Sequence, residues 1–152
     1  MFGQCIFVII RIAGIEDLPA VQQIENMCFQ EERYSTEDLS AILEEDGFET
    51  MLAEEDGAVG SAIVNYRPDL IAAQLVSLAV LPQYRGQGIA HALLREAERR
   101  VRARGARRMV LQVEVINVPA MNLYVHHGFV IEGVIGNYYG LGRDAFFMSK
   151  AL

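Results

Sequence analysis

The sequence of 152 residues predicts an α/β protein with a central, mixed but mostly antiparallel, twisted sheet of about seven strands flanked by about four helices. Two observations lead to this fold class. Short apolar, strand-like segments are interspersed with longer segments whose apolar residues recur at helical spacing, which predicts a sheet with helices on both faces. The length suits one domain, 1–152, since no linker, repeat or low-complexity segment divides the chain.

The expected elements follow one another as strand, two helices, three strands, helix, strand, helix and two strands. Their approximate ranges are strands 7–13, 49–54, 58–66, 71–81, 109–115, 129–135 and 145–152, and helices 16–29, 36–47, 89–104 and 118–127. The first helix has its apolar positions at helical spacing, at Leu18, Val21, Ile24, Met27 and Cys28.

Local signals mark where these elements begin and end. Ser35, with Asp38 three residues later, is close to a capping box and starts the second helix. Asp56-Gly57 is typical of a tight hairpin turn between two strands. Gly105 suits the position just after the long third helix, and Pro119 suits the first turn of the fourth.

Composition excludes several classes of protein. Hydrophobic residues make up 52% and charged residues 22%, which is typical of a folded globular chain. No apolar run is long enough to span a bilayer, and the apolar N-terminal stretch lacks the flanks of a signal peptide, so we expect a cytoplasmic protein without a membrane partner. Cys5 and Cys28 fall on different elements and are expected to be free thiols. The adjacent His126 and His127 point in different directions, and no cluster has zinc spacing, so no metal is expected.

The net charge of −7 is unevenly distributed. Residues 1–76 hold three basic and fifteen acidic residues, whereas residues 77–152 hold ten basic and five acidic ones. The acidic half disfavours binding of nucleic acid and suits a cationic amine or the N-terminus of a protein. Most of the arginines in the basic half lie near the end of the third helix, where they oppose the negative end of its dipole.

The segment 82–94 carries the strongest functional signal. It joins an apolar strand to a long helix through a turn that contains Gly86 and Gly88. Backbone N–H groups at a helix N-terminus lack intrahelical partners and favour anions, and glycines let the backbone approach a ligand closely, so we expect a pyrophosphate here. The turn is not the dinucleotide fingerprint, because His91 stands where that pattern needs a third glycine. A glycine turn without a ligand is the alternative.

Arg85-x-x-Gly88-x-Ala90, after the apolar strand, resembles the acyl-CoA pyrophosphate loop of the GNAT N-acetyltransferases. The order of elements is also that of the GNAT fold, and the resemblance extends from about Ile10 to the end of the chain. It implies acetyl-CoA as cosubstrate. The residues that the resemblance assigns to this cosubstrate are Leu78, Ala79, Val80, Arg85, Gly86, Gln87, Gly88, Ile89, Ala90, His91, Asn117 and Tyr124, with a backbone N–H of 78–80, that of Val80 in particular, at the thioester oxygen.

A second motif lies in 117–129, which resembles the GNAT segment Asn-x-x-Ala-x-x-Leu-Tyr-x-x-x-Gly-Phe. The resemblance implies that Asn117 hydrogen-bonds the pantetheine arm and that Tyr124 acts as general acid toward the leaving thiolate. A helix N-cap for Asn117 and a core aromatic for Tyr124 are structural alternatives that do not exclude these roles.

The C-terminal loop, with Tyr138 and Tyr139 after an asparagine, resembles the protein N-terminal acetyltransferases, including the RimI type that acetylates the N-terminal alanine of a ribosomal protein. The segment 29–39 resembles the opposite wall of their acceptor site. This resemblance implies that Phe29, Tyr34, Tyr138 and Tyr139 bind the acceptor. A loop that merely covers the end of the sheet is the alternative.

The general base departs from this pattern. Where RimI-type enzymes have a glutamate this chain has Gln112, which cannot take a proton at neutral pH, and Glu114 lies two residues further on the same strand face. Either Glu114 is the base, directly or through a water, or Gln112 and Gln74 position a water that relays the proton. A solvated charge at a strand end is the structural alternative for Glu114.

We therefore expect an acetyl-CoA-dependent N-acetyltransferase that acts by direct transfer in a ternary complex, with the α-amine of a protein or peptide as acceptor. An acetyltransferase for a small amine and a non-catalytic acyl-CoA-binding regulator are the alternatives. The oligomeric state, with a homodimer among the options, stays open.

Overall fold

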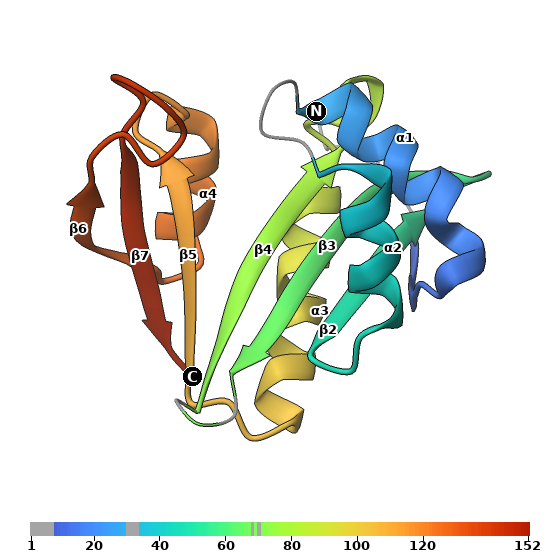
Figure 1. Ribbon diagram of the computed structural model, residues 1–152, viewed down its shortest axis with the longest axis horizontal. Coiled ribbons are helices and arrows are strands. Elements are labelled where there is room, and N and C mark those ends of the chain that lie inside the picture. Colours follow the sequence, from blue (N-terminus) through green and yellow to red (C-terminus); the bar gives the residue numbers. More distant parts are fainter. Residues whose placement is uncertain (1–7, 30–33, 68, 70) are drawn as a thin grey trace, which may run out of the picture.

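The computed structural model describes residues 8–29, 34–67, 69 and 71–152; Cys5, Phe7 and Pro68 lie outside these ranges. Within them the chain forms seven strands and four α-helices in the expected order, which confirms the fold class (Figure 1). The elements are β1 (Ile9–Ile12), α1 (Leu18–Cys28), α2 (Thr36–Glu44), β2 (Phe48–Glu54), β3 (Ala58–Arg67), β4 (Ala72–Val80), α3 (Ile89–Ala103), β5 (Arg108–Glu114), α4 (Val118–His126), β6 (Val130–Ile135) and β7 (Ala145–Ala151), with short 3-10 turns at Ile15–Asp17 and Pro82–Tyr84.

The sheet has the strand order β1-β2-β3-β4-β5-β7-β6, and every neighbouring pair is antiparallel except β4 with β5. That parallel pair is short, because only Ala72 to Gln74 of β4 pair with Arg108 to Val110 of β5. Beyond Gln74 the two strands diverge, and Figure 1 shows them as the two arms of a V. The sheet therefore opens in its middle, at the carboxyl end of β4.

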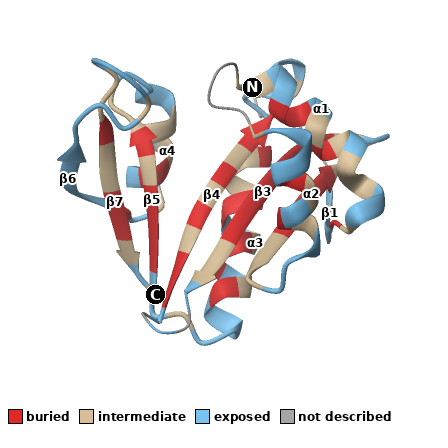
Figure 2. Ribbon diagram, in the orientation of Figure 1, coloured by how far each residue is buried: buried red, intermediate tan, exposed pale blue. Residues whose placement is uncertain are grey.

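Helices cover both faces of the sheet, with α1 and α2 on one face and α3 on the other (Figure 1). Successive side chains of β3 point to opposite faces of the sheet. Ile63 belongs to the core beneath α1 and α2, whereas Ala62 and Val64 belong to the core beneath α3. Figure 2 shows the buried residues concentrated along β3, β4, β5 and β7, while β6 is exposed at the sheet edge.

The local signals read from the sequence are present. The hydroxyl of Ser35 accepts a hydrogen bond from the backbone N–H of Asp38, so Ser35 is the N-cap of α2. Asp56 and Gly57 both have positive φ in the turn between β2 and β3. Gly105 has φ of +90° just after α3, as a left-handed C-terminal residue does.

The buried face of α1 differs from the expectation. Met27 is 55% exposed, whereas Glu25 is only 1% exposed. The helix begins at Leu18, with Pro19 in its first turn, and its buried residues are Val21, Ile24 and Glu25, flanked by the half-buried Leu18 and Cys28 at a spacing of three and four residues. Of the apolar positions expected at helical spacing, Met27 therefore points outward, and the ionisable Glu25 is buried beside Ile24.

Candidate active site

The open end of the V holds a cleft made of two adjoining hollows of about 620 and 480 Å³. We call the first the loop half, because the turn with Gly86 and Gly88 lines it. The second is the tyrosine half, lined by Tyr34, Tyr138 and Tyr139. The residues common to both halves are Cys28, Phe29, Leu78, Asn117, Ala120 and Tyr124.

In the loop half the backbone is shaped for an anion. Gly86 and Gly88 have φ of +77° and +86°, and Gly88 is the N-cap of α3. The Gly88 carbonyl accepts the N–H of Ala92, so the amides before Ala92 precede the first intrahelical hydrogen bond. A Cβ placed on either glycine would meet no atom of the described chain within 4 Å, so the space in front of the turn is open. These features fit the diphosphate of a nucleotide-bearing cosubstrate.

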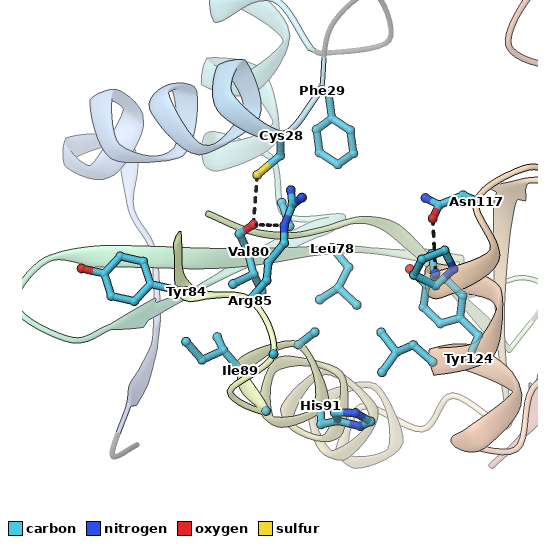
Figure 3. A pocket seen from close by; sticks show the side chains of 17 residues that line it. Cys28, Phe29, Leu78, Val80, Tyr84, Arg85, Ile89, His91, Asn117 and Tyr124 are labelled. Atoms are coloured by element: carbon cyan, nitrogen blue, oxygen red, sulfur yellow. Dashed lines mark hydrogen bonds between the residues drawn. The ribbon is translucent and has the colours of Figure 1, made fainter. Parts of the chain in front are cut away.

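The end of β4 presents backbone groups to the cleft. The N–H of Leu81 bonds the carbonyl of Val59 on β3, so by strand alternation the backbone groups of Val80 and Leu78 face away from β3, toward the opening. The Val80 carbonyl takes two hydrogen bonds, from Arg85 Nε at 2.9 Å and from the Cys28 thiol at 3.4 Å (Figure 3). The N–H groups of Leu78 and Val80 are thus aimed into the cleft.

Asn117 and Tyr124 line both hollows and so lie at the junction of the two halves. Figure 3 shows their side chains beside each other at the edge of the loop half. Asn117 Oδ1 accepts the N–H of Ala120 at 3.3 Å, so the residue is indeed the N-cap of α4 while its side chain still lines the cleft. Tyr124 is 8% exposed and packs edge-on against Phe129. Burial, together with nearby Tyr139, raises the pKa of the Tyr124 phenol, so the phenol stays neutral at physiological pH.

The aromatic residues expected at the acceptor side come together in the tyrosine half. Phe29, Tyr34, Tyr138 and Tyr139 all line it, although they derive from opposite ends of the chain. Hydrogen bonds within the loop between β6 and β7 include those from the Asn137 N–H to the Asp144 side chain and from the Gly142 N–H to the Asn137 side chain, besides backbone bonds such as Tyr139 N–H to the Arg143 carbonyl. The tyrosines of this loop therefore project from an ordered turn.

The two glutamines expected near the chemistry are in direct contact. Gln74 Nε2 donates to Gln112 Oε1 at 2.8 Å, where β4 and β5 begin to separate. Gln74 Oε1 in turn accepts from Arg67 at 2.9 Å. Both glutamines line the tyrosine half and form a neutral, hydrogen-bonded floor at the apex of the V.

Glu114 also lines the tyrosine half, but its carboxylate has a partner. Arg143 donates to it twice, through Nε at 2.9 Å and Nη2 at 2.8 Å. These bonds hold the pKa of Glu114 below its usual range. A carboxylate so paired is a weak proton acceptor at neutral pH, which weakens the case for Glu114 as the base.

Sequence reasoning missed Glu25, which lines the same half from α1. Its carboxylate accepts from the Ser77 hydroxyl at 3.0 Å and from the backbone N–H of Tyr34. Burial raises the pKa of Glu25, in contrast to Glu114. Its place in the chain could have drawn attention to it, because Glu25 follows Val21 at the same helical spacing that marks the buried positions.

Other predicted residues lie as follows. Of the residues assigned to the cosubstrate, Gln87 alone does not line the loop half. His91 does line it, and its ring contacts that of His127, the C-cap of α4, with 2.7 Å between His91 Nδ1 and His127 Nε2. In the described part of the chain, no group of three or more His, Cys, Asp or Glu side chains could hold a metal ion. No described helix is long and apolar enough to cross a bilayer.

Comparison with known proteins identifies the class to which this fold and cleft belong. Residues 18–129 match the acetyltransferase (GNAT) family, and the chain is a member of that family. It is therefore an N-acetyltransferase, and acetyl-CoA is its cosubstrate.

Individual relatives are similar over nearly the whole chain. A putative ribosomal protein bS18 alanine N-acetyltransferase of Bacillus subtilis is 32% identical over 142 residues, which cover 91% of this chain and 92% of that protein. An N-alpha-acetyltransferase of Sulfurisphaera tokodaii is 32% identical over 155 residues, with 94% and 92% covered. The crystal structure of the ribosomal-protein-S18-alanine N-acetyltransferase from Escherichia coli superposes with a TM-score of 0.86 at 26% identity, covering 95% and 94% of the two chains.

Proposed function

We propose that this enzyme transfers the acetyl group of acetyl-CoA to the N-terminal α-amine of a protein or peptide. The observation that carries the proposal is the junction of two differently built halves at Leu78 and Tyr124. A thioester placed there would have its carrier in the loop half and its acceptor in the tyrosine half. The names of the relatives, which act on N-terminal amines, favour the same class of acceptor.

The loop half would hold acetyl-CoA through backbone groups. The amides of the turn and of the first turn of α3 would bind the diphosphate, with Gly86 and Gly88 allowing close approach. The side chain of Asn117 would bind the pantetheine arm, since its amide nitrogen is not the group that caps α4.

The strand β4 would supply the donor to the thioester carbonyl oxygen. Both Leu78 and Val80 aim an N–H into the cleft, but only Leu78 lies in both halves, where the reacting carbonyl must sit. We therefore assign this role to Leu78 in preference to Val80. A backbone donor fixed before reaction stabilises the oxyanion of the tetrahedral intermediate without reorganisation.

Tyr124 would act on the leaving sulfur. Its pKa is raised by burial, so the phenol is the neutral, donating form at the working pH. A thiol is more acidic than such a phenol, so Tyr124 would donate a hydrogen bond first and release its proton only as charge builds on the sulfur. The sulfur then leaves as the CoA thiol, and a proton from solvent restores the phenol of Tyr124.

The acceptor would enter between Tyr34 and the Tyr138 loop, into the half of the cleft that is lined by Glu25 and Glu114. A panel of short peptides with different first residues, assayed by release of the CoA thiol and by mass spectrometry, tests this. We expect acetylation at the α-amine of at least one peptide and none of free amino acids, polyamines or lysine side chains. Turnover of a free small amine without any peptide would move the enzyme to the small-amine class.

A further inference from the structure

Glu25 is a buried carboxyl beside the acceptor that none of the roles above uses. It is 1% exposed, and no lysine or arginine of the described residues pairs with it. Glu98, which is 7% exposed and lies outside the cleft, differs because it forms an ion pair with Lys150, with 2.6 Å between Lys150 Nζ and Glu98 Oε1. A buried carboxylate held only by neutral donors of the described chain costs more to ionise than an exposed one, so its position calls for a chemical reason.

An irregularity in β4 brings Ser77 to this carboxyl. The pairing of β3 with β4 shifts register between Ile63 and Val64, which leaves Val76 as the extra residue of a bulge. The side chains of Val76 and Ser77 consequently both lie on the face of the sheet that α1 covers. Val76 packs against the core there, and the Ser77 hydroxyl donates to Glu25 at 3.0 Å. Without the bulge, neighbouring residues would alternate between faces.

Ser77 directly precedes Leu78 in β4, and the N–H of Leu78 is the group that we assign to the thioester oxygen. Ser77 and Glu25 both line the tyrosine half, from β4 and α1 respectively, and they are hydrogen-bonded to each other. Because Ser77 adjoins Leu78, a nitrogen held close to the thioester carbon would lie beside the Ser77 hydroxyl, with the Glu25 carboxylate as the next group in the hydrogen-bonded pair.

Resting on the function proposed above, we infer that Ser77 and Glu25 form the relay that removes the proton from the acceptor ammonium. An N–H bond of the ammonium breaks and its proton passes to Ser77 Oγ, while the hydroxyl proton of Ser77 passes to Glu25 Oε2. The lone pair freed on nitrogen forms the bond to the thioester carbon. As the tetrahedral intermediate collapses, the C–S bond breaks and Tyr124 protonates the sulfur, which leaves as CoA thiol. The second proton on the nitrogen passes to solvent, which returns a proton to Tyr124, and Glu25 later releases its proton to solvent as well.

The charged and titratable groups around the relay are compatible with this role. Tyr34 and Cys28 face Glu25, and burial raises the pKa of each, so both stay neutral below the alkaline range. Beyond them lie Tyr138 and Asp38 next to Tyr34, and Arg85 next to Cys28. The rate should increase with pH as Glu25 loses its proton. Because the pKa of Glu25 is raised and that of Glu114 is lowered, this increase should occur at a higher pH than if Glu114 were the base.

The test compares Glu25→Gln with the matched variant Glu98→Gln. The glutamine at 25 still accepts from Ser77 but cannot take a proton, so we expect kcat/KM for a peptide to fall about a hundredfold. The decrease of kcat/KM toward low pH, which the wild-type enzyme should show, should be absent in Glu25→Gln. The affinity of this variant for acetyl-CoA should stay within twofold of the wild-type value. The melting temperature at pH 8 should be equal or higher, because a neutral amide replaces a buried charge. Glu98→Gln should lower the melting temperature and leave kcat/KM within threefold.

Ser77→Ala provides a second measurement, since it keeps the carboxyl and removes the relay; kcat/KM should fall at least tenfold. The relay is wrong if Glu25→Gln keeps the wild-type pH profile, if Ser77→Ala is fully active, or if Glu25→Gln loses acetyl-CoA binding along with its fold. These outcomes can be told apart from an error in the proposed acceptor class. If peptides were not the acceptors, the wild-type enzyme itself would not acetylate any peptide.

Discussion

The loop half and the tyrosine half of the cleft differ in what recognises the ligand. The loop half is mainly backbone: the amides around Gly86 and Gly88, and the edge of β4 at Leu78. The tyrosine half is mainly side chain, contributed by α1, β4, β5 and the loop between β6 and β7. A cosubstrate common to a whole family can be held by groups that every sequence has, whereas an acceptor must be distinguished by groups that only some sequences have.

The largest expected effect comes from breaking the backbone site. Gly88→Val should weaken acetyl-CoA binding by more than a hundredfold, measured by calorimetry, because a branched side chain resists φ of +86° and would fill the space of the diphosphate.

Gly105→Val is the matched control for that variant. Gly105 has φ of +90° at the opposite end of α3, and a Cβ there also meets no described atom within 4 Å. It should cost similar stability and leave acetyl-CoA affinity unchanged. If both variants lost the cosubstrate equally, backbone strain rather than ligand contact would explain the effect.

A smaller effect, on rate alone, is expected at the junction of the halves. Tyr124→Phe should lower kcat by roughly a hundredfold with KM for acetyl-CoA unchanged, since it removes only the donor to the leaving sulfur. The phenol is buried, and no described residue is recorded as its hydrogen-bond partner, so the melting temperature should not fall. An unchanged kcat for Tyr124→Phe would assign the leaving-group role elsewhere.

The contrast between the halves also explains what the sequence could and could not predict. The loop half is built from residues that are neighbours in sequence, so the turn with Gly86 and Gly88 and the start of α3 could be predicted from one segment. The N-cap at Ser35 could be predicted for the same reason. The roles assigned to individual site residues remain predictions that await the experiments above.

The tyrosine half depends on contacts between distant segments, which periodicity does not reveal. Glu25 reads as a polar residue beside the apolar Ile24, and only the bulge at Val76 gives it a partner in Ser77. Glu114 likewise reads as a free carboxylate, because its partner Arg143 lies 29 positions away. The electrostatic difference between these two glutamates is therefore a property of the tertiary structure.

The smallest expected effect sharpens that difference. Glu114→Gln should raise KM for the peptide about threefold to tenfold, because Arg143 loses its bidentate partner beside the Tyr139 loop. We expect kcat and the pH profile to change less than twofold. The partly exposed pair should contribute about 0.5–1 kcal/mol to the free energy of unfolding.

The sign of the pH dependence follows from the lowered pKa of Glu114. The ion pair stabilises the fold above the ordinary carboxyl pKa, and this contribution is lost as the pH falls through the lowered value. The stability difference between wild type and Glu114→Gln should therefore vanish in acid. Glu132→Gln, which breaks the pair with Arg108 on the exposed edge strand, should show the same trend without a change in KM. If Glu114→Gln instead abolished the low-pH limb and lowered kcat about a hundredfold, Glu114 would be the base after all, and Glu25 would be left with only a structural role.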